Sequence, residues 1–130
     1  MSEPVWINKD AVLSMHQEAL LNHGGAEGVR DIGLLESALA RPENLFAYSE
    51  KAPSLAQLAA SYAKGIVANH PFLDGNKRTA FIVSVTFLLL NGLKLTAAKE
   101  DRVLTFWGLA DGSLSEEQLA EWFERWTAPL

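Results

Sequence analysis

The spacing of apolar residues along the chain predicts a series of helices joined by short loops. In the first helix, apolar residues recur three and four positions apart between residues 12 and 20. Asn8 or Asp10 is placed to cap this helix, which is expected to run to about Asn22. Gly24-Gly25 would end it, because glycine accepts the left-handed turn of a helix stop.

Two further helices are expected in the next part of the chain. Asp31 is a natural N-cap for a short helix that stops before Pro42, because the residue before a proline avoids helical dihedral angles. Residues 42–53 are expected to form a loop. The sequence Ser-Leu-Ala-Gln at 54–57 is a capping-box pattern, and the third helix that it opens would end at Asn69.

The most apolar segment predicts a central helix. This helix starts at Asn76, is apolar on nearly every side between residues 80 and 90, and ends at Asn91-Gly92. A helix without a polar face belongs at the centre of a domain. Residues 93–95 are expected to form a brief extended segment, for which residues 5–7 are the candidate pairing partner.

The remainder of the chain predicts two more helices. Thr96 is placed to cap the fifth, which would end at Asp111-Gly112. Ser113-Leu114-Ser115-Glu116 is a capping-box pattern opening the last helix, whose apolar face carries Leu119, Trp122, Phe123 and Trp126. The fold class that follows is all-α: residues 1–130 form a single compact domain of about six helices, with at most a minor β segment.

Composition narrows the function classes. The net charge of −5 argues against direct nucleic-acid binding, which needs a basic face. The absence of cysteine excludes a disulfide framework and fits a reducing compartment, so a cytoplasmic protein is expected. The N-terminal residues lack the pattern of a signal peptide, and the longest apolar run is too short to cross a bilayer. No membrane association is therefore expected.

Groups suited to nucleotide chemistry gather in one stretch just before the fourth helix. His70 can accept a proton near neutral pH, and Asp74 suits a hard divalent cation. Gly75-Asn76-Lys77-Arg78 lies where the helix begins, so its free N–H groups can bind phosphate. Asn76 is equally suited to capping the helix and to orienting the loop. Phe72 is expected to be a buried anchor of the loop.

Other polar residues have simpler explanations. His16 and His23 lie two turns apart, roughly 10 Å, which is too far to share a metal ion, so structural or surface roles are favoured. A solvated helix face explains the acidic residues Glu116, Glu117, Glu121 and Glu124. The sequence leaves the role of Arg30-Asp31 open. Either Asp31 caps its helix and Arg30 is a surface charge, or the pair flanks the site on the side of the target.

The stretch at 70–78 does not match a Walker-type phosphate loop, in which Gly directly precedes Lys. It resembles instead the signature of the Fic/Doc family, His-x-Phe-x-(Asp/Glu)-(Gly/Ala)-Asn-(Gly/Lys)-Arg. Gly24-Gly25, the segment Arg-Asp-x-Gly-Leu-Leu-Glu-Ser-Ala at 30–38, and the final Trp-bearing helix are similar to the Doc (death on curing) branch. The resemblance covers nearly the whole chain.

Two positions distinguish the chemistry within this family. AMP-transferring Fic enzymes typically have Gly after the Asn and a second Arg three residues beyond the first, where this chain has Lys77 and Phe81. The ammonium of Lys77 would occupy or re-charge the anion site, and Phe81 removes a clamp on the distal phosphates. Both changes match Doc proteins, whereas Pro71 and Gly75 are Fic-like and keep AMP transfer as the alternative.

The resemblance implies a toxin of a toxin–antitoxin system that transfers the γ-phosphoryl group of ATP to a threonine of elongation factor Tu and blocks translation. His70 would be the general base and Asp74 would hold Mg²⁺. Gly75, Asn76, Lys77 and Arg78 would bind phosphate, with Arg78 stabilising the transition state. A catalytically silent binding module is the third possibility, against which the intact motif argues.

The resemblance also implies how such a protein is restrained. The inhibitory helix of many Fic enzymes pairs its Glu with the second motif Arg, which is absent here. The expected restraint is a separate Phd-like antitoxin, encoded by the adjacent gene, whose C-terminal segment folds into a groove on this protein.

Overall fold

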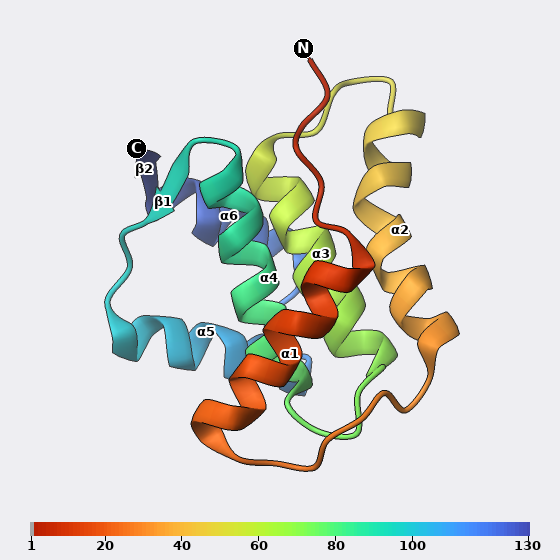
Figure 1. Cartoon of the computed structure of the whole chain (residues 1–130). Coiled ribbons are helices and arrows are strands. Elements are labelled where there is room, and N and C mark those ends of the chain that lie inside the picture. The colour runs from red at the N-terminus through yellow and green to blue at the C-terminus, as the bar shows by residue number, and fades with distance from the viewer. Residues whose placement is uncertain (1) are drawn as a thin grey trace.

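The structure, a computed structural model, describes residues 2–130 and consists of helices with one small sheet (Figure 1). The elements in chain order are α1 (Lys9–His23), α2 (Ile32–Tyr48), α3 (Leu55–Asn69), α4 (Asn76–Leu90), β1 (Leu93–Leu95), α5 (Lys99–Asp111), α6 (Glu116–Arg125) and β2 (Thr127–Pro129). The expected all-α fold with a minor β segment is confirmed. Within residues 2–130, no helix has the length and apolar character needed to cross a membrane.

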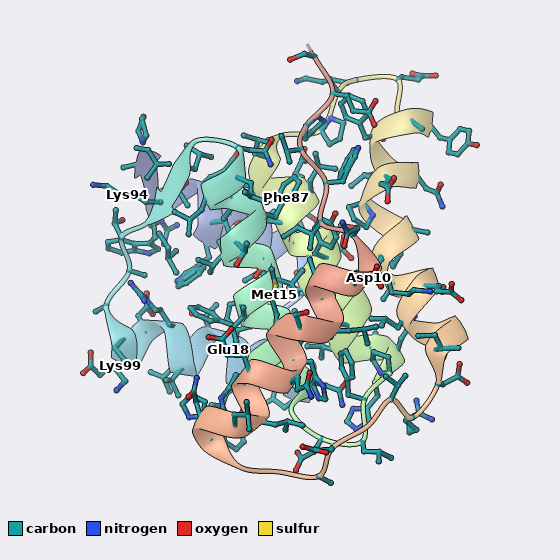
Figure 2. The ribbon with its side chains drawn as sticks, viewed as in Figure 1. Asp10, Met15, Glu18, Phe87, Lys94 and Lys99 are labelled. Atoms are coloured by element: carbon teal, nitrogen blue, oxygen red, sulfur yellow. The ribbon has the colours of Figure 1, made fainter. Side chains whose placement is uncertain are left out.

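Helices α3 and α4 lie side by side in the middle of the molecule (Figure 1). Helix α3 also packs on α2 and α6, while α1 packs on α4. No residue of α4 between Thr79 and Leu88 is exposed, as the apolar pattern of this helix predicts. Phe87 of α4, labelled in Figure 2, packs between Trp6 and Tyr62 with ring centroids 5.9 Å and 5.1 Å away. The packed pair of α3 and α4 therefore holds the loops at its ends in fixed positions.

Helix α2 is longer than the sequence pattern predicts. It continues through Pro42 to Tyr48, so the loop expected at 42–53 is reduced to residues 49–53, and the predicted helix end before Pro42 is wrong. A proline inside a helix costs about 3 kcal/mol, because it removes one hydrogen bond and crowds the preceding turn. Burial offsets this cost, since the inner face of α2 packs on α3 through Leu35, Ala38, Leu39 and Pro42.

Gly65 of α3 lies close against the backbone of α2. A Cβ atom at this position would lie 3.1 Å from the Ala38 carbonyl oxygen and 3.2 Å from its Cα. We expect Gly65→Val to lower the free energy of unfolding by about 1–3 kcal/mol, because the backbones must separate. Urea denaturation measures this, with Ala68→Val on the exposed side of α3 as the control for helix propensity. Equal losses in both variants would contradict the packing argument.

The small sheet pairs the segment after α4 with the C-terminal strand. β1 pairs antiparallel with β2, Lys94 opposite Ala128, so the expected pairing of residues 93–95 with residues 5–7 is wrong. The N-terminal segment is attached nearby through a side chain instead, because Asn91 accepts a hydrogen bond from the Val5 N–H at 2.9 Å. A three-residue strand carries too little pattern to specify its partner.

Two helix starts also differ from expectation. Helix α5 begins at Lys99 with Ala98 at its N-cap, while the Thr96 hydroxyl donates to the Trp126 carbonyl oxygen at 2.9 Å. The Thr96 hydroxyl thus bonds to the C-cap residue of α6 and does not cap α5. In α6 the capping box lies two residues later than predicted: Ser115 pairs with Gln118, not Ser113 with Glu116. The box in α3, Ser54 with Gln57, is as expected.

Candidate functional site

His70 lies at the junction between α3 and the loop that leads into α4. Its backbone adopts the left-handed conformation, with φ 51° and ψ 54°, and its N–H donates to the Ile66 carbonyl oxygen at 3.0 Å. The expected end of α3 before Pro71 is therefore confirmed. The His70 side chain is exposed and lines a cavity of about 530 Å³. It can reach a substrate hydroxyl that enters the cavity from solvent.

Asn76 holds the loop together from below. Its side chain is buried, accepts a hydrogen bond from the Phe72 N–H and donates one to the Phe72 carbonyl oxygen, both at 3.0 Å. Phe72 is completely buried, as expected of an anchor. The N-cap position belongs to Gly75, at φ 77°, so Asn76 orients the loop and does not cap the helix.

The N-terminus of α4 offers an anion-binding site. The N–H groups of Asn76, Lys77 and Arg78 have no acceptor inside the helix, since the first intrahelical bond runs from the Thr79 N–H to the Gly75 carbonyl oxygen at 2.9 Å. The Arg78 side chain is exposed, and the Lys77 ammonium lies 3.7 Å from the centre of the Trp107 ring. Two cations therefore stand beside free helix amides, which suits phosphate.

Asp74 is exposed, but its carboxylate is tethered. One oxygen accepts from the Gly75 N–H at 2.8 Å and the other from the Ala26 N–H at 3.4 Å. Gly25 allows this approach, because a Cβ there would lie 2.9 Å from the Asp74 oxygen. Residues 2–130 contain no group of three or more His, Cys, Asp or Glu side chains placed to hold a metal ion. A single held carboxylate fits Mg²⁺ that is bound mainly by phosphates and water.

A second loop is paired with the motif loop along its backbone. Val29 forms an antiparallel bridge with Phe72, and the Arg30 N–H donates to the Pro71 carbonyl oxygen at 2.7 Å. The Arg30 guanidinium donates to the carbonyl oxygens of His70, at 2.7 Å, and Asn69, at 2.9 Å. Arg30 thus fixes the backbone of His70 and satisfies the C-terminal end of α3.

Asp31 caps α2, accepting from the Leu34 N–H at 3.0 Å. Asp31 is thus a helix cap, and the Arg30 side chain bonds to the backbone of His70. Neither residue lines the cavity beside His70.

His16, for which the sequence predicts only a structural or surface role, lies directly beneath the motif loop. It is 4% exposed, stacks on Phe72 with ring centroids 3.7 Å apart, and contacts the Asp74 carbonyl oxygen at 2.8 Å through Nε2. A signal was present in the sequence, because Val12, His16 and Leu20 are spaced four apart on the buried face of α1. A histidine in an apolar stripe has to find a polar partner, and here the partner is the motif loop.

Two cavities meet at the N-terminal end of α4. The first, beside His70, is also lined by Asp74, Trp107 and Asp111. Hydrogen bonding from Ser113 holds the pKa of Asp111 below its ordinary value, so this wall of the cavity is charged at neutral pH. The second, of about 520 Å³, shares three residues with the first and continues between α4 and α5; the shared residues are Lys77, Arg78 and Trp107.

Comparison with known proteins identifies the family. A sequence profile of the Fic/DOC family matches residues 6–88. The chain belongs to the Fic/Doc family. The toxin Doc of Mycolicibacterium smegmatis is 43% identical over 74 residues, which cover 57% of this chain and 57% of that protein. The protein kinase doc of Escherichia phage P1 is 30% identical over 119 residues, which cover 92% of this chain and 93% of that protein.

Both of these relatives carry the name Doc, so the resemblance to the Doc branch is confirmed. Within this Fic/Doc domain, the position of the second Arg of Fic enzymes is taken by Phe81. Its ring packs edge-on against Phe106 of α5, with centroids 5.1 Å apart. Phe81 therefore gives α4 an aromatic contact with α5.

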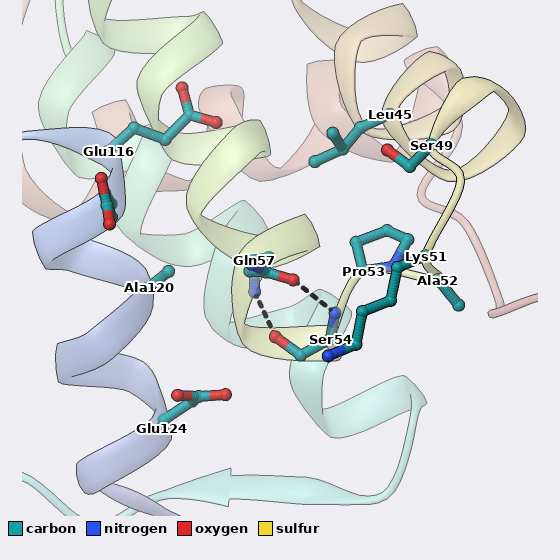
Figure 3. Close-up of a pocket in the computed structure, with 11 residues that line it drawn as sticks. Leu45, Ser49, Lys51, Ala52, Pro53, Ser54, Gln57, Glu116, Ala120 and Glu124 are labelled. Carbon is teal, nitrogen blue, oxygen red and sulfur yellow. Dashed lines mark hydrogen bonds between the residues drawn. The ribbon is translucent and has the colours of Figure 1, made fainter.

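A further cavity, of about 700 Å³, lies away from the Fic/Doc motif (Figure 3). It is bounded by the loop after α2, the capping box of α3 and the acidic side of α6. Glu116 on its wall pairs with Arg41 at 2.7 Å, while Glu117, Glu121 and Glu124 are exposed. The prediction of a solvated acidic face is confirmed except at Glu116, whose carboxylate is engaged in the ion pair.

Proposed function

We propose that this protein is a Doc-type toxin that acts as a protein kinase. In this proposal it transfers the γ-phosphoryl group of ATP to a threonine of elongation factor Tu in the cytoplasm and thereby blocks translation. The observation that carries the proposal is one cavity lined both by His70 and by the N-terminus of α4 with Lys77 and Arg78. A base beside a phosphate site is what hydroxyl phosphorylation requires.

His70 acts as the general base. Its imidazole removes the proton of the threonine hydroxyl as the oxygen attacks the γ-phosphorus, and the bond from the γ-phosphorus to the leaving oxygen breaks. Arg30 supports this step indirectly, because it fixes the His70 carbonyl oxygen and so limits movement of the left-handed residue.

The N-terminus of α4 binds the phosphate groups. The free amides, Lys77 and Arg78 face the oxygens on which negative charge is concentrated, and the exposed Arg78 guanidinium stabilises charge in the transition state. Asp74 would hold Mg²⁺, which would neutralise phosphate charge.

Kinase activity is favoured over AMP transfer by the two positions that depart from the Fic pattern. The Lys77 ammonium reaches Trp107 across the cavity, and Phe81 contributes an aromatic contact instead of a phosphate clamp. These features match a nucleotide whose γ-phosphate, rather than its α-phosphate, faces His70. The name of the phage P1 relative, protein kinase doc, supports the same choice.

The experiment that tests the proposal is label transfer to purified elongation factor Tu. ATP labelled in the γ-phosphate and ATP labelled in the α-phosphate are compared in parallel with Mg²⁺, using the native protein and His70→Ala. We expect label from the γ-phosphate alone, lost in the variant. Label from the α-phosphate would identify the protein as an AMP transferase, and no label from either would favour a silent binding module.

A separate antitoxin of the Phd type, encoded by the adjacent gene, is the proposed partner. The groove between α4 and α5 is its proposed binding surface. The groove combines cations with apolar side chains in a protein whose net charge is −5, and it suits an acidic amphipathic segment that folds on binding. The residues that line this groove and not the cavity beside His70 are His23, Phe81, Ile82, Lys99, Arg102, Val103 and Phe106.

We expect Val103→Asp to weaken antitoxin binding at least about tenfold, because it replaces an apolar contact with a carboxylate that repels an acidic segment. Val103 lines the groove but not the cavity beside His70, so label transfer without antitoxin should be unchanged. The matched control is Leu104→Asp, which adds the same charge one residue outside the groove. Equal weakening in both variants, measured by calorimetry, would argue against this surface.

A further inference from the structure

A buried histidine in α1 is left unused by the mechanism proposed above. His16 lies beneath the motif loop, between the ring of Phe72 and the start of α4. A Cβ atom on Gly75 would lie 3.7 Å from the His16 Nε2, so the ring also closes against the N-cap of α4. Although 58 residues separate His16 from Asp74 in the chain, the two are joined by a hydrogen bond.

The direction of this hydrogen bond follows from its partner. A carbonyl oxygen can only accept, so the 2.8 Å contact requires the proton to be on the His16 Nε2. A neutral imidazole has one N–H, so a neutral His16 is the Nε2–H tautomer. The parallel stack on Phe72, with an interplanar angle of 9°, fixes the plane in which that N–H points.

The accepting carbonyl belongs to the peptide group between Asp74 and Gly75. The same peptide group carries the Gly75 N–H, which donates to the Asp74 carboxylate at 2.8 Å. It also precedes the left-handed Gly75, whose φ of 77° directs the chain into α4. One donor from α1 therefore fixes both the proposed metal ligand and the proposed phosphate-binding amides.

We propose that His16 is a positioning residue of the active site, acting through the Asp74–Gly75 peptide group on the binding of Mg²⁺ and nucleotide phosphate. This inference rests on the proposed function for what is bound, and on the observed contacts for how the loop is held. His16 does not touch the reacting groups, because it lies behind the loop and outside both cavities beside α4.

The first test compares two substitutions at this position. His16→Phe keeps an aromatic ring against Phe72 but has no donor, whereas His16→Gln keeps an N–H at the reach of Nε2. We expect the phenylalanine variant to raise the KM for Mg²⁺-ATP about tenfold or more, the scale seen when groups behind metal ligands are removed, with kcat less affected. The glutamine variant should recover most of this loss.

Val12→Ala is the matched control. Val12 is buried one turn before His16 on the same face of α1, and its apolar side chain has no donor for the Asp74 carbonyl oxygen, so its truncation should lower stability without changing KM. The inference is overturned if His16→Phe leaves KM unchanged, or if His16→Gln and His16→Phe are equally impaired. It is also overturned if Val12→Ala raises KM as much as His16→Phe does.

A spectroscopic measurement tests the contact without any activity. In nitrogen-detected NMR of the native protein, the ring of His16 should carry a proton on Nε2, and the Gly75 amide should shift in His16→Phe. The opposite tautomer would overturn the inference. If the tautomer and the Gly75 shift are as expected while the native protein transfers no label, the proposed function fails and the contact between His16 and the loop stands.

Discussion

Replacing His70 with asparagine should lower the rate of γ-phosphoryl transfer by about 10³-fold, because a general base contributes roughly two to four powers of ten. Nucleotide binding should be retained, since the proposed phosphate site is the N-terminus of α4 and does not include the imidazole. The measurement is the initial rate of label transfer to elongation factor Tu, together with the Kd of ATP by calorimetry.

Asparagine is chosen because of the backbone at this position. His70 is the single non-glycine residue with positive φ among residues 2–130, and asparagine tolerates that conformation better than alanine. His70→Ala should therefore lose the same activity and, in addition, about 1 kcal/mol of stability. A transfer rate within threefold of the native rate in His70→Asn would contradict the assignment of the base, whatever happens to stability.

The sequence assigns the candidate site to one short segment because the local signals agree. Pro71 ends α3, glycine begins α4, and the residues between them carry the reactive groups, so one short segment specifies both geometry and chemistry. The Fic/Doc match includes residues 70–78, the segment whose residue types already indicate nucleotide chemistry.

What the sequence did not predict depends on contacts between distant segments. Pro42 signals a helix end locally, yet packing of its turn against Gly65 keeps α2 helical. Thr96 is a good capping residue, yet a carbonyl of Trp126 competes for its hydroxyl. Nor does the spacing of His16 within α1 reveal which loop accepts its N–H. In each case a tertiary contact overrides or completes a local preference.

The second large effect is expected at Asn76. Asn76→Ala should lower the free energy of unfolding by about 2–4 kcal/mol, because it leaves the N–H and the carbonyl oxygen of buried Phe72 without partners. Transfer by the molecules that remain folded should fall about 100-fold, since a catalytic loop displaced by about 1 Å loses activity on that scale. Urea denaturation and label transfer per folded molecule measure the two effects.

Asn91 provides a natural control for this experiment. Its side chain makes the same kind of paired contact, accepting from the Val5 N–H at 2.9 Å and donating to the Val5 carbonyl oxygen at 3.0 Å. It lies at the opposite end of α4, roughly 22 Å from Asn76 at 1.5 Å per residue. Asn91→Ala should lower stability, by less because its contacts are more exposed, and leave transfer per folded molecule unchanged. If both variants lose transfer activity in proportion to their loss of stability, Asn76 stabilises the fold and has no separate role in the site. If transfer per folded molecule falls only in Asn76→Ala, its two hydrogen bonds set the position of His70 and Asp74.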